Sequence, residues 1–159
     1  MSHRHRRDFL QRSAMGLAGA AALSSVSQAA AAHDKTVIGI IGPGGMGTSH
    51  LKTLVKNDAV DFAYVCDVDQ NRLAAAVKNV EAAGRPAPKA VVDLRRILED
   101  KSVDAVFIAT PDHWHAPATI LACDAGKHAY VEKPGSHNIR EGRLMIEPAR
   151  RTKRIVQVG

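Results

Sequence analysis

Three glycines near the start of the chain, Gly42, Gly44 and Gly47, have the spacing G-x-G-x-x-G. They follow an apolar run that is typical of a strand and open a segment that is typical of a helix, which is the context that a phosphate-binding turn requires. The first glycine would permit a tight turn, the second would keep side chains away from a pyrophosphate, and the third would let the helix pack closely on the strand. Free N–H groups and the positive dipole at the helix N-terminus would then face the phosphates of a dinucleotide. The residues predicted to bind it here are Gly42, Gly44, Gly45, Met46 and Gly47.

An aspartate stands at the end of the second predicted strand, twenty residues after Gly47. The carboxylate of Asp67 could accept hydrogen bonds from both hydroxyls of an adenosine ribose, and it would repel a 2′-phosphate. Asp67 therefore favours NAD over NADP, although Arg72 nearby could assist NADP. The alternative role for Asp67 is to cap the following helix, and Asp69 could do that instead.

Two further polar segments, Thr110–His115 and Glu132–Pro134, follow the fourth and fifth predicted strands. In open α/β sheets, ligands bind at the carboxyl ends of the strands, so both segments are candidates for a site. His113 and His115 are two residues apart and could suggest a metal, but no third ligand is evident, and we predict no metal site. Trp114 is expected to serve packing rather than chemistry.

Short apolar runs alternate with longer amphipathic segments from Lys35 onward. The expected strands are Thr36–Ile41, Phe62–Cys66, Lys89–Val92, Asp104–Ala109, Ala129–Glu132 and Ile155–Val158. The expected helices are Gly45–Asn57, Gln70–Ala83, Leu94–Glu99, Pro117–Ala125 and Ile139–Arg151. This alternation, with nearly continuous apolar strands, predicts an α/β fold with a doubly wound parallel sheet, the NAD(P)-binding Rossmann fold.

Composition sets outer limits on the function. The chain has 159 residues, of which 45% are hydrophobic, enough for one domain of ordinary size. No apolar run reaches the roughly 18 residues that a membrane span needs. The net charge of +6 is spread without a basic stripe between aromatic residues, so we predict no nucleic-acid partner. Cys66 and Cys123 lack metal-type spacing and are expected to be buried free thiols rather than a disulfide.

The first 32 residues differ from the rest of the chain. A basic front is followed by a weakly apolar run, Ala14–Leu23, and by the small residues of Ser27–Ala32. This order is typical of a secretory signal peptide, and Arg6–Leu10 resembles the twin-arginine class, although His5 stands where serine is usual. We therefore expect residues 1–32 to be a twin-arginine signal, the protein to be periplasmic or otherwise exported, and residues 33–159 to be the folded domain. The alternative is an alanine-rich helix or tail.

Several motifs together resemble the Gfo/Idh/MocA family, which includes glucose–fructose oxidoreductase and inositol dehydrogenase. The motifs are the glycine turn, Cys66–Asp69, Thr110–His115, Ala125–His128, Glu132–Pro134 and Val156–Gly159. The resemblance implies hydride transfer between a nicotinamide and a carbon of a sugar or polyol. It also implies that Lys133 lies by the nicotinamide and the substrate hydroxyl as the catalytic residue. An ammonium in that place can stabilise developing alkoxide charge or relay a proton.

The same resemblance implies that Thr110, Pro111 and His113 lie along the nicotinamide. Glu132 and Lys133 are both predicted to be among the cofactor-binding residues. For Glu132, a structural anchor is the role we prefer over catalysis.

Two residues depart from the family pattern. Gly135 stands where a large apolar residue is usual, and Pro148 interrupts a helix where alanine is usual, which weakens the last helix.

We also expect the second, substrate-binding domain of the family to be absent, with homo-oligomers formed by full-length relatives. That expectation keeps open two alternatives to a sugar oxidoreductase: a nucleotide-binding module without turnover, and a glycosidase that uses NAD transiently.

Overall fold

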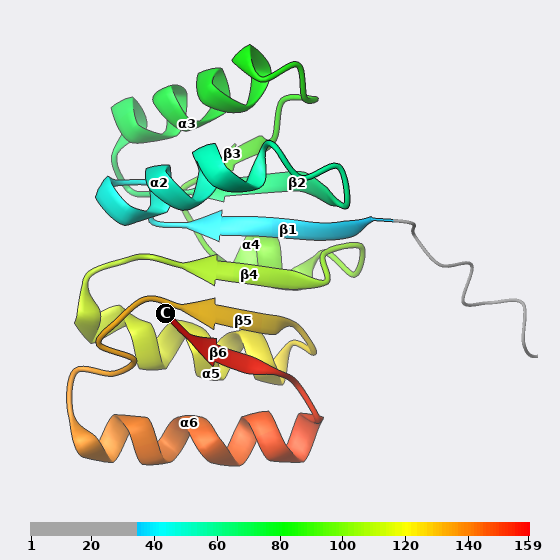
Figure 1. The fold of residues 1–159 in the computed structure, drawn as a ribbon. Helices are drawn as coiled ribbons and strands as arrows, with labels where there is room; N and C mark the ends of the chain where they lie inside the picture. Colours follow the sequence, from blue (N-terminus) through cyan, green and yellow to red (C-terminus); the bar gives the residue numbers. More distant parts are fainter. Residues whose placement is uncertain (1–34) are drawn as a thin grey trace, which may run out of the picture. The chain divides into compact units, whose positions relative to one another are not determined.

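Six parallel strands form one sheet in the order β3-β2-β1-β4-β5-β6 (Figure 1). The computed structural model describes residues 35–159. The strands are β1 (Thr36–Ile41), β2 (Val60–Cys66), β3 (Lys89–Val91), β4 (Ala105–Ile108), β5 (His128–Val131) and β6 (Val156–Val158). The helices are α2 (Gly45–Leu54), α3 (Gln70–Ala82), α4 (Arg95–Glu99), α5 (His115–Asp124) and α6 (Ile139–Thr152), with a 3₁₀ turn, η1 (Asp112–Trp114). The predicted α/β class and doubly wound parallel sheet are confirmed.

The sheet separates two hydrophobic cores. One core joins Leu51 of α2 and Leu73 of α3 to strand side chains such as Ile38 and Ile40. The other core lies on the opposite face, where residues of α4, α5 and α6 pack against the sheet. Figure 1 accordingly shows α2 in front of the sheet and α4 and α5 behind it. Because helices cover both faces, the central strands carry almost only apolar side chains.

Most element bounds agree with the predicted ones to within a few residues, and the differences have local causes. Helix α2 ends at Leu54 rather than Asn57, because the chain tightens into a turn in which Asn57 Oδ1 accepts a hydrogen bond from Ala59 N at 3.0 Å. Helix α5 begins at His115 rather than Pro117. Pro117 is tolerated in the first turn, where a backbone N–H would have no helical partner.

Helix α6 passes through Pro148 without ending. The side chain of Asn138 caps its start by accepting a hydrogen bond from Glu141 N at 2.9 Å. Pro148 has no N–H to donate, and the helix nevertheless extends to Thr152, whose hydroxyl donates to the Pro148 carbonyl at 2.7 Å. The last helix therefore forms over a full 14 residues despite the proline.

Two other expectations concern side chains and the leader. Cys66 and Cys123 are both free and buried, as predicted, and burial raises the pKa of the Cys66 thiol to about 12. Among the described residues, no helix is long and apolar enough to cross a membrane. The predicted signal at residues 1–32 lies outside the described residues.

Candidate functional site

The two central strands, β1 and β4, send the chain to opposite faces of the sheet. After β1 the chain enters α2 on one face, and after β4 it enters α5 on the other. The two connections therefore diverge at the carboxyl edge, which is where doubly wound sheets bind ligands. The predicted site segments all lie at this edge, which is the end toward which the strand arrows point in Figure 1.

The glycine turn after β1 is sterically closed to larger residues. Gly42 has a backbone φ of +81°, and a Cβ there would lie 2.8 Å from the Ala109 carbonyl oxygen. A Cβ on Gly47 would overlap the carbonyl oxygen of Gly42. These contacts are the tight turn and the close helix–strand packing that the spacing predicted for the first and third glycines.

The N-terminus of α2 presents unpaired backbone donors. Its first helical hydrogen bond is donated by Thr48 N to the Gly44 carbonyl at 2.7 Å, so the N–H groups of Gly45, Met46 and Gly47 have no helical acceptor. The first turn carries no acidic side chain. Such a helix end attracts the negative charge of a phosphate.

Gly44 lies close to an arginine side chain, a contact that the sequence did not predict. A Cβ at Gly44 would lie 3.2 Å from Nη1 of Arg72, which reaches toward the turn from α3. The missing side chain at Gly44 therefore leaves room for this guanidinium as well as for a ligand.

Asp67 lies directly after β2, the strand next to β1, and its side chain is only 8% exposed. Its Oδ1 accepts a hydrogen bond from Asp69 N at 3.0 Å, and its Oδ2 lies 3.9 Å from Arg72 Nη1. Asp69 caps α3 by accepting from Asn71 N at 2.8 Å, so Asp67 is not needed for that role. An Asp67 carboxylate held in place beside the glycine turn suits recognition of a ribose.

The segment after β4 contains a buried hydroxyl without a partner. Thr110 Oγ1 is buried and makes no hydrogen bond among the described residues. Buried polar atoms are nearly always paired in folded proteins, so this hydroxyl fits contact with a bound ligand. Pro111 and His113 are exposed beside it, as a role along a cofactor requires, and His113 Nδ1 lies 3.8 Å from Asp112 Oδ1.

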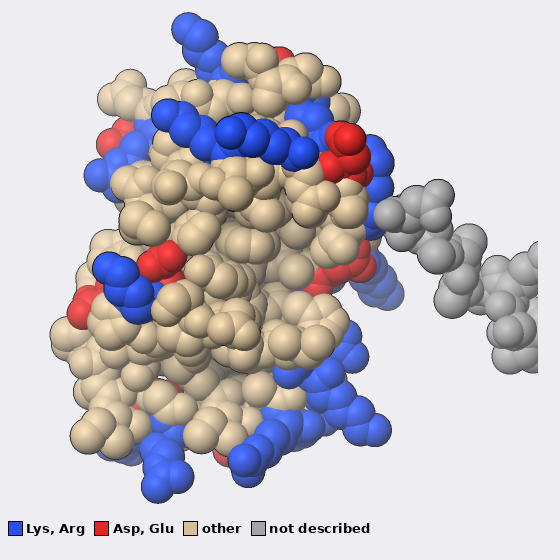
Figure 2. All heavy atoms as spheres, in the orientation of Figure 1, with Lys and Arg blue, Asp and Glu red and all other residues tan. Residues whose placement is uncertain are grey.

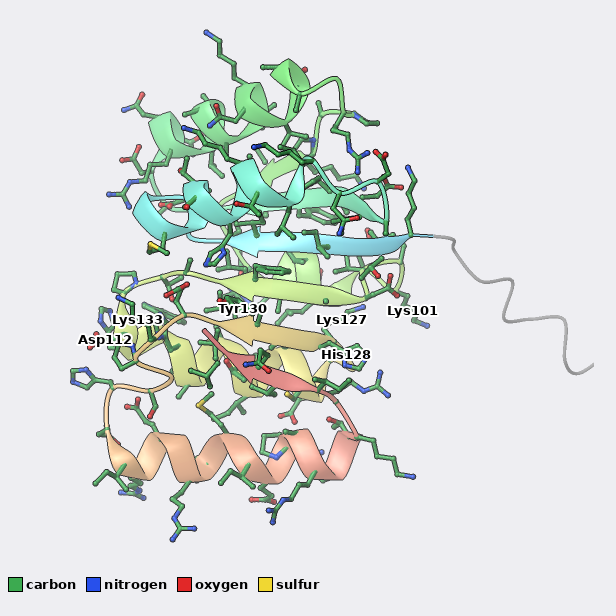
Figure 3. The ribbon with its side chains drawn as sticks, in the orientation of Figure 1. Lys101, Asp112, Lys127, His128, Tyr130 and Lys133 are labelled. Carbon is green, nitrogen blue, oxygen red and sulfur yellow. The ribbon has the colours of Figure 1, made fainter. Side chains whose placement is uncertain are left out.

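Lys133 follows β5 at the same edge, and Figure 3 shows it, with Asp112, at the end of the sheet opposite Lys127 and His128. Its side chain is exposed and, within residues 35–159, enters no hydrogen bond or ion pair. Its backbone N–H donates to Glu132 Oε2 at 3.2 Å. The ammonium is thus free to meet a ligand, while the backbone that carries it is held.

Glu132 acts as an anchor in this structure. Its side chain is 8% exposed, and Oε1 accepts a hydrogen bond from Nε2 of His50 in α2 at 2.6 Å. The bond from His50 lowers the pKa of the Glu132 carboxyl. Tyr130 and Phe107 pack around His50, with ring centroids 5.1 and 6.0 Å from it. The preference for a structural anchor agrees with these contacts.

Sequence reasoning missed His50 and His137. His50 is three residues after Gly47, so it lies on the helix face that packs against the sheet, and that spacing could have indicated it. His137 Nδ1 lies 3.2 Å from Asp112 Oδ2, a contact between two loops that no local pattern predicts. His115 has both ring nitrogens beside backbone carbonyls, those of Pro134 and Thr110.

Charge is distributed unevenly on the face shown in Figure 2. Lys and Arg gather along its lower edge, over α6, and in a row across its upper part, while the middle of the face is largely uncharged. Basic residues of α6 and its end are Arg140, Arg143, Arg150, Arg151 and Lys153. No basic stripe crosses the middle of this face.

Comparison with known proteins shows the family. Residues 36–159 match the model of an "Oxidoreductase family, NAD-binding Rossmann fold". A glycosyl hydrolase family 109 protein of Shewanella baltica (strain OS185) is 31% identical over 177 aligned residues, covering 97% of this chain and 39% of that protein.

Two solved structures are similar to the described fold. The WlbA dehydrogenase from Chromobactrium violaceum, in complex with NADH and UDP-GlcNAcA, is 28% identical with a TM-score of 0.71. The myo-inositol 2-dehydrogenase from Lactobacillus plantarum is 26% identical with a TM-score of 0.70. The matches cover 79% of this chain, and 35% and 36% of those chains, so this sequence spans well under half the length of its relatives. The chain belongs to the Gfo/Idh/MocA oxidoreductase family, whose matched domain is an NAD-binding Rossmann fold.

Proposed function

We propose that residues 33–159 bind NAD at the carboxyl edge of the sheet and serve an oxidoreductase that acts on a sugar or polyol. The observation that carries the proposal is the placement of two features at one edge. The open N-terminus of α2 follows β1, and the unpaired ammonium of Lys133 follows β5. One dinucleotide would meet both, since its central pyrophosphate and its terminal nicotinamide belong to the same molecule.

Each predicted residue has a defined part in this proposal. The N–H groups of Gly45, Met46 and Gly47 hold the pyrophosphate, and Asp67 accepts hydrogen bonds from the adenosine ribose. Thr110, Pro111 and His113 border the nicotinamide, with the unpaired Thr110 hydroxyl as a donor or acceptor toward it. A bound nicotinamide would supply the acceptor for the hydride that leaves the substrate carbon.

Lys133 is the residue we propose for catalysis. In its neutral form the Lys133 amine would accept the proton of the substrate hydroxyl as the hydride leaves the carbon, and in its ammonium form it would stabilise negative charge on that oxygen and return the proton in the reverse direction. Glu132 holds the backbone at Lys133 through the 3.2 Å hydrogen bond and is itself tied to α2 by His50. The phosphate helix and the proposed catalytic residue are thereby connected.

Sugars and polyols are the proposed substrate class because of the similar proteins. One similar structure holds UDP-GlcNAcA with NADH, and another is named a myo-inositol dehydrogenase. Both compounds carry secondary hydroxyls that an oxidoreductase of this family can oxidise.

Cofactor binding is tested with purified residues 33–159. Titration by NADH fluorescence and by calorimetry should show saturable binding of NADH and NAD, with NADP weaker. Replacing Lys133 by alanine should alter oxidation of sugars and polyols far more than it alters NADH affinity. Absence of saturable binding by the folded wild type would contradict the proposal.

A second candidate function rests on the similarity to the glycosyl hydrolase family 109 protein, which extends over 97% of this chain. In this version the same site would oxidise and re-reduce a glycoside, so that NAD is not consumed. Release of nitrophenol from nitrophenyl glycosides that needs NAD but accumulates no NADH would identify it. Accumulation of NADH in step with sugar oxidation would identify the dehydrogenase instead.

We further propose that residues 1–32 are a twin-arginine signal that exports the folded domain to the periplasm or beyond. The support is the order of basic, weakly apolar and small residues, with Arg6 and Arg7 before Phe9 and Leu10.

A further inference from the structure

A hollow lies between α6 and the edge strand β6, which run alongside each other in Figure 1. Its volume is about 770 Å³, in the range of pockets that hold small molecules. One wall is a single face of α6, whose lining residues have helical spacing: Gly142, Met145, Ile146, Ala149 and Arg150. Val156 and Val158 of β6 line the other wall.

The middle of the hollow is apolar and partly open to solvent. Ile146 of α6 is 40% exposed, and Val158 of β6 is 45% exposed. Gly135, which stands where a large apolar residue is usual in the family, lines the same hollow and places no side chain in it. A Cβ there would lie 3.1 Å from Val158 Cγ2, so a larger residue would take up part of this space. An apolar surface that is hollowed and left open suits a ligand with an apolar body.

Two arginines line the hollow where α6 ends. Arg154 is half-buried, and it donates from Nε to the Thr152 carbonyl at 3.0 Å and from Nη1 to the Gly126 carbonyl at 3.3 Å. These neutral carbonyls hold the guanidinium in place without cancelling its charge. Among residues 35–159, neither Arg150 nor Arg154 pairs with a carboxylate, and no Asp or Glu lines the hollow. Because arginine is always charged, this end of the hollow complements an anion.

We propose that the hollow binds an aliphatic carboxylate, with its apolar chain between α6 and β6 and its carboxylate at Arg150 and Arg154. Along α6, Gly142 and Arg150 are about 12 Å apart at about 1.5 Å per residue, which suits the extended chain of a medium-chain fatty acid.

The hollow is separate from the proposed dinucleotide site, since it contains neither the glycine turn nor Lys133. The two are nevertheless adjacent along the chain, because Pro134, Gly135 and Ser136 line the hollow and directly follow Lys133. A bound carboxylate would therefore contact the segment that carries the proposed catalytic residue, whether or not NAD is bound.

Titration of the full ¹⁵N-labelled chain with decanoate, followed by ¹H–¹⁵N correlation, tests the site. We expect one saturable set of shifts, with the glycine turn unmoved, at the amides of Gly135, Ser136, Ala149, Arg150 and Val158. Decanol has the same chain without the charge and should bind about tenfold more weakly. Acetate has the charge without the chain and should cause no saturable shift. Equal affinities for decanoate and decanol, or decanoate shifts that do not saturate, would overturn the proposal.

Variants separate the charge from the apolar wall. Arg150→Gln changes an exposed side chain and should weaken decanoate binding about tenfold, while decanol affinity stays unchanged. Arg143→Gln removes an exposed charge from the same helix outside the hollow, and as the matched control it should alter neither affinity. Ala149→Leu adds volume inside the hollow and should weaken decanoate and decanol alike.

Equal decanoate affinity in the wild type and in folded Arg150→Gln would overturn the proposed role of the arginines, and with it the choice of ligand. Shifts of the same amides that depend on protein concentration, without decanoate, would show that a second copy of the chain covers the hollow, and would overturn the proposal too.

Discussion

His50 donates a hydrogen bond from Nε2 to Oε1 of Glu132 across 2.6 Å, which ties the helix after the glycine turn to the residue that precedes Lys133. Because this bond favours the ionised carboxyl, it lowers the pKa of Glu132 in the folded chain below the value of about 4.3 for a free glutamate. The contribution to stability is then complete above about pH 4.3 and is lost as the pH falls through the lowered pKa.

We expect the free energy of unfolding to fall with acidification below that pH, and to fall less in Glu132→Gln. Urea unfolding of both proteins from pH 7 to pH 3 measures the difference. Glu99→Gln is the control, since Glu99 pairs with Arg96 on the surface, where both side chains are more than 60% exposed. Parallel curves for wild type and Glu132→Gln would argue against the His50 contact.

Gly47→Ala should destabilise the chain, because the added Cβ would overlap the Gly42 carbonyl oxygen and force α2 away from β1. Overpacking of this kind costs about 3 kcal/mol. Gly45→Ala is the matched control, since nothing lies within 4 Å of a Cβ there, and it should hold or raise stability by up to about 1 kcal/mol. Equal denaturation midpoints for the two variants would show that the close approach is not as described.

Asp67→Ala should change the choice of cofactor. Loss of the ribose hydrogen bonds is expected to weaken NAD binding by roughly tenfold to a hundredfold, while NADP binding holds or improves because a repulsive charge is gone. Calorimetric titration of both cofactors measures the ratio. Asp58→Ala, which removes a carboxylate that is 98% exposed and paired with Arg85, should leave the ratio unchanged. Tighter NADP than NAD binding in the wild type, unaffected by Asp67→Ala, would refute the assignment.

The proposed leader is tested by a reporter fused to residues 1–40. Export should stop when Arg6 and Arg7 are both replaced by lysine, because the twin-arginine route reads the arginine pair rather than positive charge alone. Cell fractionation measures the reporter in each compartment. If the variant with both lysines is exported to the same extent as the wild type, the leader belongs to another class of signal.

Local patterns predicted the fold and the phosphate turn, because an apolar strand and a glycine spacing are each features of a few consecutive residues. Thr36–Ile41 has the predicted bounds, and Gly42 has the positive φ that a tight turn needs. Asp104, predicted as the first residue of a strand, lies just before β4, where its carboxylate accepts a hydrogen bond from Val37 N at 2.8 Å.

Contacts between distant segments were beyond a single sequence. The pairing of His50 with Glu132 spans 82 residues, and His115 reaches the carbonyl of Pro134, 19 residues away. No periodicity encodes either partner, since each depends on how a helix meets the loop after β5 once the sheet has formed. The residues of the proposed site could therefore be named from the sequence, whereas the contacts that hold them in place could not.

The order of strands in the sheet also bears on when the site comes into existence during folding. Most neighbouring strands are close in sequence, as in the contacts of Tyr64 with Lys89 and of His128 with Ile155, which span 25 and 27 residues. The join between β1 and β4 is different, since the bond from Val37 to Asp104 spans 67 residues. Closing the longest loop carries the largest entropy cost and slows folding. The glycine turn lies on one side of this join and Lys133 on the other. A chain in which each half has folded separately would lack part of the proposed dinucleotide site, so we expect cofactor binding to favour molecules that have made the most distant contact in the sheet.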